Sequence, residues 1–234
     1  LFDVYMELGN YDLAEGMLTE IKDFKDFDYL IRLAKWNDHK GDLDTAIDLM
    51  EKAMSIVEIT KNEDLKVWIY SNIADFYGHA GRIQEAYDYY LKTLAIDNNN
   101  TYALKGIAWI SFSYERNSQQ ALDIIQYIEN KHSVPDLFLL KADIYDYQGK
   151  EKEKQLALHH YFAMLSNHDY GDMYNKYNAL LYAEMPGETE KAFVLAKKEI
   201  GNRPTPESYD LLAWSYYNMG DYKNAHNIIT KYTL

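Results

Sequence analysis

A single small residue recurs along this 234-residue chain at nearly regular intervals. Alanines that follow a turn and open a helical pattern are spaced by 32, 40, 35, 36, 35 and 33 residues, at Ala14, Ala46, Ala86, Ala121, Ala157, Ala192 and Ala225. A period of this size is typical of chains built as a linear array of similar units, each contacting its neighbours. The spacing therefore predicts about seven repeats rather than one closed globular core.

A turn signature accompanies the alanine. A glycine stands five residues before it in five of the seven repeats, at Gly9, Gly41, Gly81, Gly187 and Gly220. Glycine ends a helix by adopting a left-handed conformation at low cost. Twelve residues before the alanine, a second small residue, as at Ala34, Ala74 and Ala213, allows a preceding helix to approach closely. Each repeat is therefore predicted to be a hairpin of two antiparallel helices.

Two stretches carry a family resemblance. The sequence SYDLLAWSYYNMGDYKNAHNII, residues 208–229, resembles a tetratricopeptide repeat, and so does WIYSNIADFYGHAGRIQEAYDYYLKTLAID, residues 68–97. The resemblance covers essentially the whole chain. It implies an all-α fold, a right-handed α-solenoid of about seven antiparallel helix pairs, forming a single domain over residues 1–234. The expected repeats span approximately residues 1–26 (partial), 27–66, 67–100, 101–134, 135–169, 170–204 and 205–234.

Some repeats depart from the pattern. The spacing of 40 residues between Ala46 and Ala86 predicts a longer second helix that runs to about Ile59. The expected glycine is missing at Arg116 and Lys152, and Gly149 comes three residues early, so the register of the first helix there stays open by one to three residues. Because solenoids need solvated ends, we also expect the natural protein to extend beyond both termini of this sequence.

Composition and motifs exclude several functions. With 37 acidic and 24 basic side chains, the net charge of −13 disfavours nucleic acid as a partner. No apolar run approaches the roughly 20 residues of a membrane span. The chain has no cysteine, no HExxH spacing among its histidines and no phosphate- or dinucleotide-binding loop. Neighbouring carboxylates such as Asp143 and Asp146 are expected by chance in so acidic a chain. We therefore predict no catalytic residue, no metal site and no cofactor.

The histidines and most aromatic residues are predicted to be structural. His39 and His79 occupy equivalent positions two residues before a turn glycine, and solvated surface is the favoured interpretation over a metal-binding or pH-sensing pair. The rings predicted to face the partner helix and fill the core are Trp36, Tyr77, Tyr90, Tyr145 and Tyr161.

Other residues occur at first-helix positions that, in the family, line the inner, concave surface. The resemblance implies a partner-binding set of aromatic side chains, Trp68, Tyr174, Tyr177 and Trp214, interleaved with Asp28, Asp38, Asp75, Glu184 and Asp210. Rings and carboxylates together suit an extended or helical peptide that carries Lys or Arg. The alternative is that these are ordinary solvated residues.

One known specificity of the family is not expected here. The carboxylate clamp of chaperone-binding tetratricopeptide repeats needs Lys and Asn at set inner positions. The corresponding places hold Ile31 and Lys35, Ser71 and Asp75, or Asp210 and Trp214. Binding of a chaperone C-terminus is therefore disfavoured.

The sequence thus predicts a non-enzymatic scaffold that binds a partner protein or peptide in its concave groove. The alternative is a repeat arm that acts as a spacer or dimerisation module of a larger envelope protein or enzyme. The repeats are similar to those of exported tetratricopeptide repeat proteins of Bacteroidetes-like bacteria, which favours the cell envelope or periplasm over the cytoplasm. The identity of the partner and the oligomeric state stay open.

Overall fold

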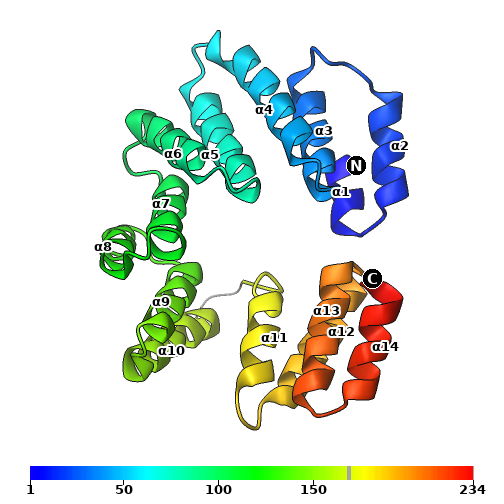
Figure 1. The fold of residues 1–234 in the computed structure, drawn as a ribbon, viewed down its shortest axis with the longest axis vertical. Helices are drawn as coiled ribbons and strands as arrows, with labels where there is room; N and C mark the ends of the chain where they lie inside the picture. The colour runs from blue at the N-terminus through cyan, green and yellow to red at the C-terminus, as the bar shows by residue number, and fades with distance from the viewer. Residues whose placement is uncertain (168–169, 234) are drawn as a thin grey trace. The chain divides into compact units, whose positions relative to one another are not determined.

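The computed structural model describes residues 1–167 and 170–233, and within them all regular structure is helical (Figure 1). The helices are α1 (Phe2–Glu7), α2 (Tyr11–Glu20), α3 (Phe27–His39), α4 (Leu43–Glu58), α5 (Glu63–His79), α6 (Ile83–Ile96), α7 (Thr101–Ser113), α8 (Ser118–Glu129), α9 (Pro135–Tyr147), α10 (Glu151–Asn167), α11 (Asn175–Glu184), α12 (Thr189–Asn202), α13 (Pro206–Asn218) and α14 (Tyr222–Tyr232). Among these helices none is both long enough and apolar enough to cross a membrane.

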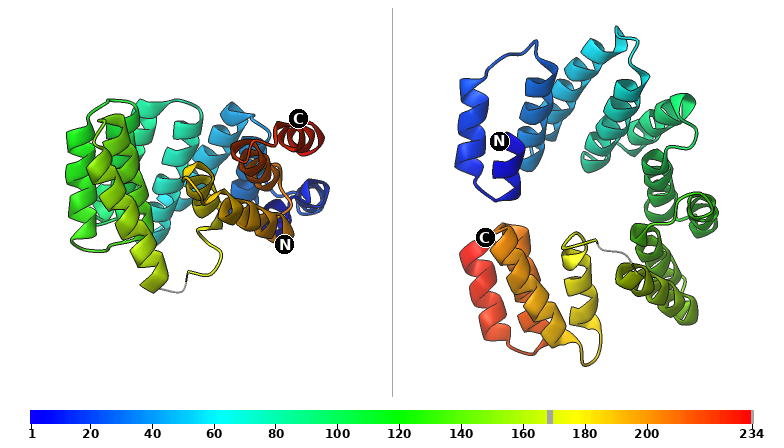
Figure 2. Two further views of the ribbon diagram at one scale, coloured as in Figure 1. Left: turned by 90° about the horizontal axis from the view of Figure 1, so that it is seen from below. Right: turned by 180° about the vertical axis from the view of Figure 1, so that it is seen from behind.

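The chain divides into two compact units. The central unit comprises Lys22–Asp169 and holds α3 to α10, whereas the terminal unit combines Leu1–Ile21 with Tyr170–Leu234 and holds α1, α2 and α11 to α14. Within the central unit each helix packs against the next in chain order (Figure 1 and Figure 2). In the terminal unit α11 to α14 do the same, and α1 packs against α2. The fold prediction, an all-α solenoid of about seven helix pairs, is confirmed.

Small side chains bring the helices together. All seven of the regularly spaced alanines are buried, and so are Ala34, Ala74 and Ala213 on the first helices. An alanine leaves the two backbones close enough for larger neighbours to interlock around it. In the central unit those neighbours form one apolar cluster across α3 to α7, which includes Leu30, Ile47, Met50, Ile69 and Ile73. The repeat signature is therefore a packing signature.

A left-handed residue closes every hairpin. The residue two positions before each second helix has a φ between 58° and 81°, at Gly9, Gly41, Gly81, Arg116, Gly149, Gly187 and Gly220. Gly149, three residues early by the alanine count, thus holds the same structural place as the other turn glycines. Arg116 adopts the left-handed conformation without being a glycine. The predicted long second helix is confirmed, because α4 continues to Glu58.

Turn length varies between hairpins. Five of the turns inside the hairpins have three residues, such as residues 40–42 between α3 and α4. The turns at residues 114–117, between α7 and α8, and at residues 185–188, between α11 and α12, have four. One extra residue in the turn shifts every position of the first helix by one when it is counted back from the alanine of the second.

The strain at Arg116 predicts a stabilising substitution. A β-carbon in the left-handed region costs roughly 1–2 kcal/mol, and glycine avoids this cost. We expect Arg116→Gly to be more stable than Arg116→Ala by about 1 kcal/mol in urea unfolding. Both variants lose the stacking of the Arg116 guanidinium on the Tyr147 ring, 5.7 Å from its centroid, so alanine is the matched control. Equal stability of the two variants would contradict the assignment.

Replacement of Gly106 by alanine is expected to destabilise the protein, although alanine usually stabilises a helix relative to glycine. A β-carbon at Gly106 in α7 would lie 2.3 Å from the ring of the buried Tyr90. We expect Gly106→Ala to lower the free energy of unfolding by about 1 kcal/mol or more, because overpacking outweighs the gain in helix propensity. The control is Gly16→Ala in α2, where a β-carbon meets nothing within 4 Å and alanine should stabilise. Adding Tyr90→Leu to Gly106→Ala should cost less than the sum of the single changes.

Candidate polypeptide-binding groove

One face of α5 carries a continuous row of side chains that point away from the core. Asp64, Trp68, Ser71, Asn72 and Asp75 follow the spacing of neighbours along one side of a helix. The buried Ile69 and Ile73 occupy the opposite side and belong to the apolar cluster. Asn62 caps the start of this helix, because its side chain accepts a hydrogen bond from the Leu65 N–H at 3.0 Å. The core and the cap together fix which side chains this face presents.

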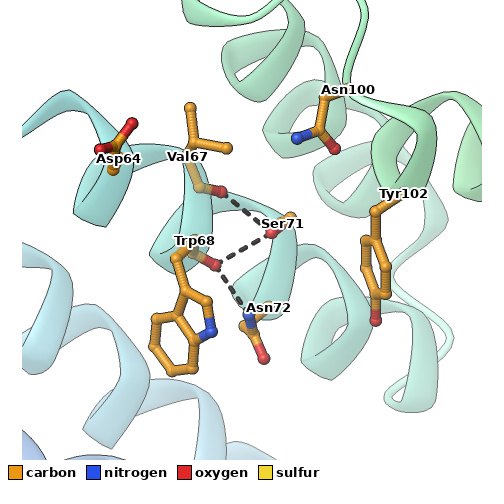
Figure 3. Close-up of a pocket in the computed structure, with 7 residues that line it drawn as sticks. All are labelled: Asp64, Val67, Trp68, Ser71, Asn72, Asn100 and Tyr102. Atoms are coloured by element: carbon orange, nitrogen blue, oxygen red, sulfur yellow. Dashed lines mark hydrogen bonds between the residues drawn. The ribbon is translucent and has the colours of Figure 1, made fainter.

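The first turn of α7 faces this row. Asn100 caps α7 by accepting a hydrogen bond from the Ala103 N–H at 3.0 Å, and this cap sets the position of Tyr102. Between α5 and α7 lies a hollow of about 490 Å³. Figure 3 shows Trp68 and Tyr102 on its two sides with Ser71 and Asn72 between them. Asp64, Val67 and Asn100 complete the lining. We call this hollow the aromatic groove.

Asp75 holds one wall of the aromatic groove in place. Its carboxylate accepts a hydrogen bond from the Tyr90 hydroxyl at 2.5 Å and a second from the Tyr102 hydroxyl. Burial is the main cause that raises the pKa of Tyr90, and the negative charge of Asp75 adds to it. Burial is also the main cause that raises the pKa of Tyr102, followed by the hydrogen bond to Asp75. Both phenols therefore stay protonated donors. Asp75, expected from the sequence to meet a partner, instead anchors the chain's own tyrosines.

Trp68 forms the other wall. Its indole is 38% exposed and meets the ring of Phe27 edge to face, with centroids 6.0 Å apart. The Asn72 amide nitrogen donates to the Trp68 carbonyl at 2.8 Å, which directs the amide oxygen of Asn72 away from that carbonyl (Figure 3). The Ser71 hydroxyl donates to the carbonyls of Val67 and Trp68. The groove thus offers two ring faces and an amide acceptor to a ligand.

The remaining predicted carboxylates of the central unit lie on α3. Asp28 is exposed, with its carboxylate 3.8 Å from the Arg32 guanidinium. Asp38 is hydrogen-bonded to His79 Nδ1 at 2.9 Å, a contact that links α3 to α5. The described residues include no group of three or more histidines and acids arranged to hold a metal ion. His79 is therefore engaged with a carboxylate of the neighbouring repeat.

The other predicted carboxylate pair lies on α9. Burial and the nearby Asp146 raise the pKa of Asp143, and the charge of Lys154 opposes this shift. Asp146 itself accepts a hydrogen bond from Lys154 at 2.7 Å. The pair behaves as a small charge cluster at the end of α9.

The terminal unit carries an aromatic row of its own. On α13, Trp214 stacks on Tyr217 with centroids 5.4 Å apart, and Tyr217 meets Tyr222 at 5.2 Å. Asp210, one turn before Trp214, is exposed. On α11, Glu184 and Tyr177 are also exposed, and the Lys176 ammonium lies 5.9 Å from the Tyr177 ring centroid. These four predicted residues, Tyr177, Glu184, Asp210 and Trp214, are accessible on the terminal unit.

The structure corrects the placement of Tyr174. This side chain is only 6% exposed and packs edge to face on Tyr170, with centroids 5.3 Å apart. Tyr174 lies 18 residues before Ala192, as Trp68 lies 18 before Ala86. The four-residue turn after α11 adds one position to that count, so Tyr174 corresponds to the buried Ile69 rather than to Trp68. Its ring belongs to the packing of α11.

The same effect hid two inner residues on α7. Tyr102 stands six residues before the buried Ala108, as Trp68 stands six before Ala74, and it is 48% exposed. Trp109 directly follows Ala108, as Asp75 follows Ala74, and it is also exposed. Counting back twelve residues from Ala121 arrives at Trp109 instead of the alanine. Alignment on Ala108 itself is the signal that would have found both.

The Asp75 anchor predicts a stability difference. Tyr102→Phe removes one donor to a carboxylate and should lower the free energy of unfolding by about 1 kcal/mol. The control is Tyr127→Phe, which removes an exposed hydroxyl that donates to the neutral Asn99 at 3.0 Å and accepts a hydrogen bond from Lys131, and it should cost less. Urea unfolding of both variants measures the difference. If both variants lost the same free energy of unfolding, the hydrogen bond from Tyr102 to Asp75 would contribute no more to stability than that from Tyr127 to Asn99.

A pH series provides an independent check on the same variant. In the unfolded chain tyrosines ionise near pH 10, whereas the folded pKa of Tyr102 is higher, so the folded state keeps more protons above that pH. Stability must therefore fall as pH rises past about 10. Tyr102→Phe removes one contributing group, and its decline should be shallower than that of the unaltered chain.

Comparison with known proteins supports the repeat architecture. Two family models described as tetratricopeptide repeat match residues 28–99 and residues 206–233. The fold is similar to a tetratricopeptide repeat protein from Parabacteroides merdae, at 20% identity and a TM-score of 0.58, covering 98% of this chain and 88% of that one. No curated protein matches the sequence significantly.

Two further structures are similar. BtubC from P. vanneervenii is 17% identical with a TM-score of 0.54, over 97% of this chain and 88% of that one. A chain of the hetero-tetramer Cut9–Hcn1 is 14% identical with a TM-score of 0.52, over 94% of this chain and 48% of that one. At these identities the likeness establishes the fold.

Proposed function

We propose that this chain, which matches tetratricopeptide repeat models over residues 28–99 and 206–233, is a non-catalytic scaffold that binds an extended segment of a partner polypeptide in the aromatic groove. Repeats of this family generally serve as scaffolds for protein–protein interaction. One structural neighbour belongs to a hetero-tetramer, which is consistent with such a role. The groove supplies the specific surface on the central unit.

The observation that carries the proposal is the pair of exposed rings on neighbouring first helices. Trp68 and Tyr102 are partly exposed although each is held in place, Trp68 by Phe27 and Tyr102 by Asp75. Rings that are already ordered lose little conformational entropy when a ligand packs between them. The amide oxygen of Asn72 can accept a hydrogen bond from a ligand's backbone N–H. This combination suits an extended chain.

Charge favours a basic partner segment. Asp64 lies one helical turn before Trp68 at the edge of the groove, and Asp28 is exposed on the adjacent α3. A Lys or Arg side chain could stack on the Trp68 indole while its charge lies near Asp64. The excess of acids, with a net charge of −13, would further favour encounter with a basic segment. Asp38 and Asp75 are held by internal hydrogen bonds, so Asp28 and Asp64 are the carboxylates we assign to the partner.

We extend the proposal to the terminal unit. Trp214 and Asp210 present a ring and a carboxylate one turn apart on α13, and Tyr177 and Glu184 present a ring and a carboxylate two turns apart on α11. These side chains could contact a separate part of the same partner. The two units are treated as independent binding surfaces.

The test selects peptides from a random 12-residue display library on the whole chain and measures their affinity by fluorescence anisotropy. We expect enrichment of Lys or Arg and at least tenfold weaker binding to Trp68→Ala, since a central aromatic contact commonly contributes more than about 1.4 kcal/mol. Tyr114→Ala, which truncates an exposed ring in the turn after α7, is the control and should bind normally.

Circular dichroism must show that Trp68→Ala keeps its helix content and thermal unfolding. Selected peptides that bind Trp68→Ala and the unaltered chain equally would rule out the aromatic groove. A library that yields no peptide from repeated selections would count against the scaffold role itself.

A further inference from the structure

A second hollow opens on another side of the central unit. It has a volume of about 390 Å³ and lies among α8, α9 and α10. Its lining consists of Gln126, Glu129, Phe138, Lys141, Tyr145, Glu153, Leu156, Ala157 and His160. On α9 these residues belong to the side that faces α8 and α10, whereas the inner positions of that helix hold Asp136 and Asp143. We call this hollow the α8–α10 pocket.

Two repeats earlier, in the hairpin of α5 and α6, a tyrosine occupies the equivalent place. Tyr89 of α6 stacks on Tyr77 of α5, with ring centroids 5.3 Å apart and planes 16° from parallel. Its ring also lies 6.1 Å from that of Tyr70. The Lys92 ammonium lies 3.9 Å from the Tyr89 ring centroid. A tyrosine side chain therefore packs stably between helices at this position of the repeat.

Counting from the left-handed turn residue identifies the equivalent positions. Tyr77 lies four residues before Gly81, and Tyr145 lies four before Gly149. In this hairpin the buried alanine comes eight residues after the turn glycine instead of five, so Ala157 occupies the position that Tyr89 holds in the hairpin of α5 and α6. Tyr145 is thus present in the place of Tyr77, but no ring stands in the place of Tyr89 to stack on it.

Two other wall positions of the pocket also carry a ring or a basic side chain, as they do in the hairpin of α5 and α6. Phe138 takes the place of Tyr70, eleven residues before the turn glycine, and His160 takes that of Lys92, eleven residues after it. Phe138 and His160 stack on each other at 5.5 Å, with planes 29° apart. The pocket therefore has an aromatic frame around the space that a tyrosine fills in the hairpin of α5 and α6.

A nearly buried ion pair lies in the same pocket. The side chains of Lys141 and Glu129 are 14% and 11% exposed and form a salt bridge. Lys141 corresponds to the fully buried Ile73, eight residues before the turn glycine, and Glu129 corresponds to Met54, thirteen after the left-handed residue. Two apolar positions have changed together to a charged pair, which is seldom favourable for stability alone. The pair can instead exchange hydrogen bonds with a ligand's hydroxyl group.

From these observations we propose that the α8–α10 pocket binds the phenol ring of a tyrosine side chain from a partner polypeptide. The ring stacks on Tyr145, as Tyr89 does on Tyr77, and its hydroxyl group reaches the Lys141–Glu129 pair. This site is separate from the aromatic groove and does not depend on the function proposed for it.

The experiment uses the whole chain with N-acetyltyrosinamide as the probe and N-acetylleucinamide as its aliphatic control, followed by amide chemical shifts in nuclear magnetic resonance. We expect saturable shifts around Lys141, Tyr145 and His160 at millimolar tyrosine probe, and at least tenfold weaker binding of the leucine probe. Ala157→Tyr should fill the pocket with the chain's own ring and abolish these shifts. Absence of saturation, or equal shifts in Ala157→Tyr, would overturn the proposal.

Two further arms keep the result decisive. If Ala157→Tyr does not fold, the double variant Phe138→Leu/His160→Ala removes the aromatic frame and must weaken the tyrosine probe at least fivefold, and unchanged affinity would overturn the site. The probe p-cresol supplies the same phenol without a peptide backbone. Binding of p-cresol tenfold tighter than N-acetyltyrosinamide would assign the pocket to a free phenol and overturn its assignment to a partner polypeptide.

Discussion

Close contact at alanine is the constraint on which this structure depends. At each hairpin a buried alanine on the second helix allows the neighbouring backbones to approach, and larger side chains such as Leu30 and Met50 then interlock around the contact. Where the alanine comes five residues after the left-handed turn residue, a larger side chain would separate the helices and leave the surrounding apolar surface poorly packed. Ala157 is different, because it comes eight residues after Gly149 and borders the α8–α10 pocket. The inner and outer faces of the repeats follow from this contact, because it fixes the rotation of every helix.

The same contact explains how much of the fold could be predicted. The recurring alanine and its turn residue determine the number of repeats and the pairing of helices, and both were available in the sequence. Positions on a first helix could be predicted only where the intervening turn has three residues. The extra residue at 114–117 hid Tyr102, and the extra residue at 185–188 placed Tyr174 wrongly on the surface.

Contacts between residues far apart in the chain also limited what could be predicted of the candidate site. Asp75 was expected from the sequence to be a carboxylate available to a partner. Its engagement with Tyr90 and Tyr102 depends on α6 and α7 being placed beside α5, at 15 and 27 residues' distance in the chain. Periodicity along one helix carries no information about such contacts. The number of acidic residues predicted on a repeat surface is therefore larger than the number of carboxylates that are available to a ligand.

The Lys141–Glu129 pair gives the array a fixed order. The lysine belongs to the hairpin of α9 and α10, and the glutamate to the hairpin before it. Joints made only of aliphatic side chains tolerate the duplication, loss or exchange of modules by recombination. At this joint, exchange of one module alone would leave Lys141 or Glu129 without its charged partner, so the two neighbouring hairpins depend on each other.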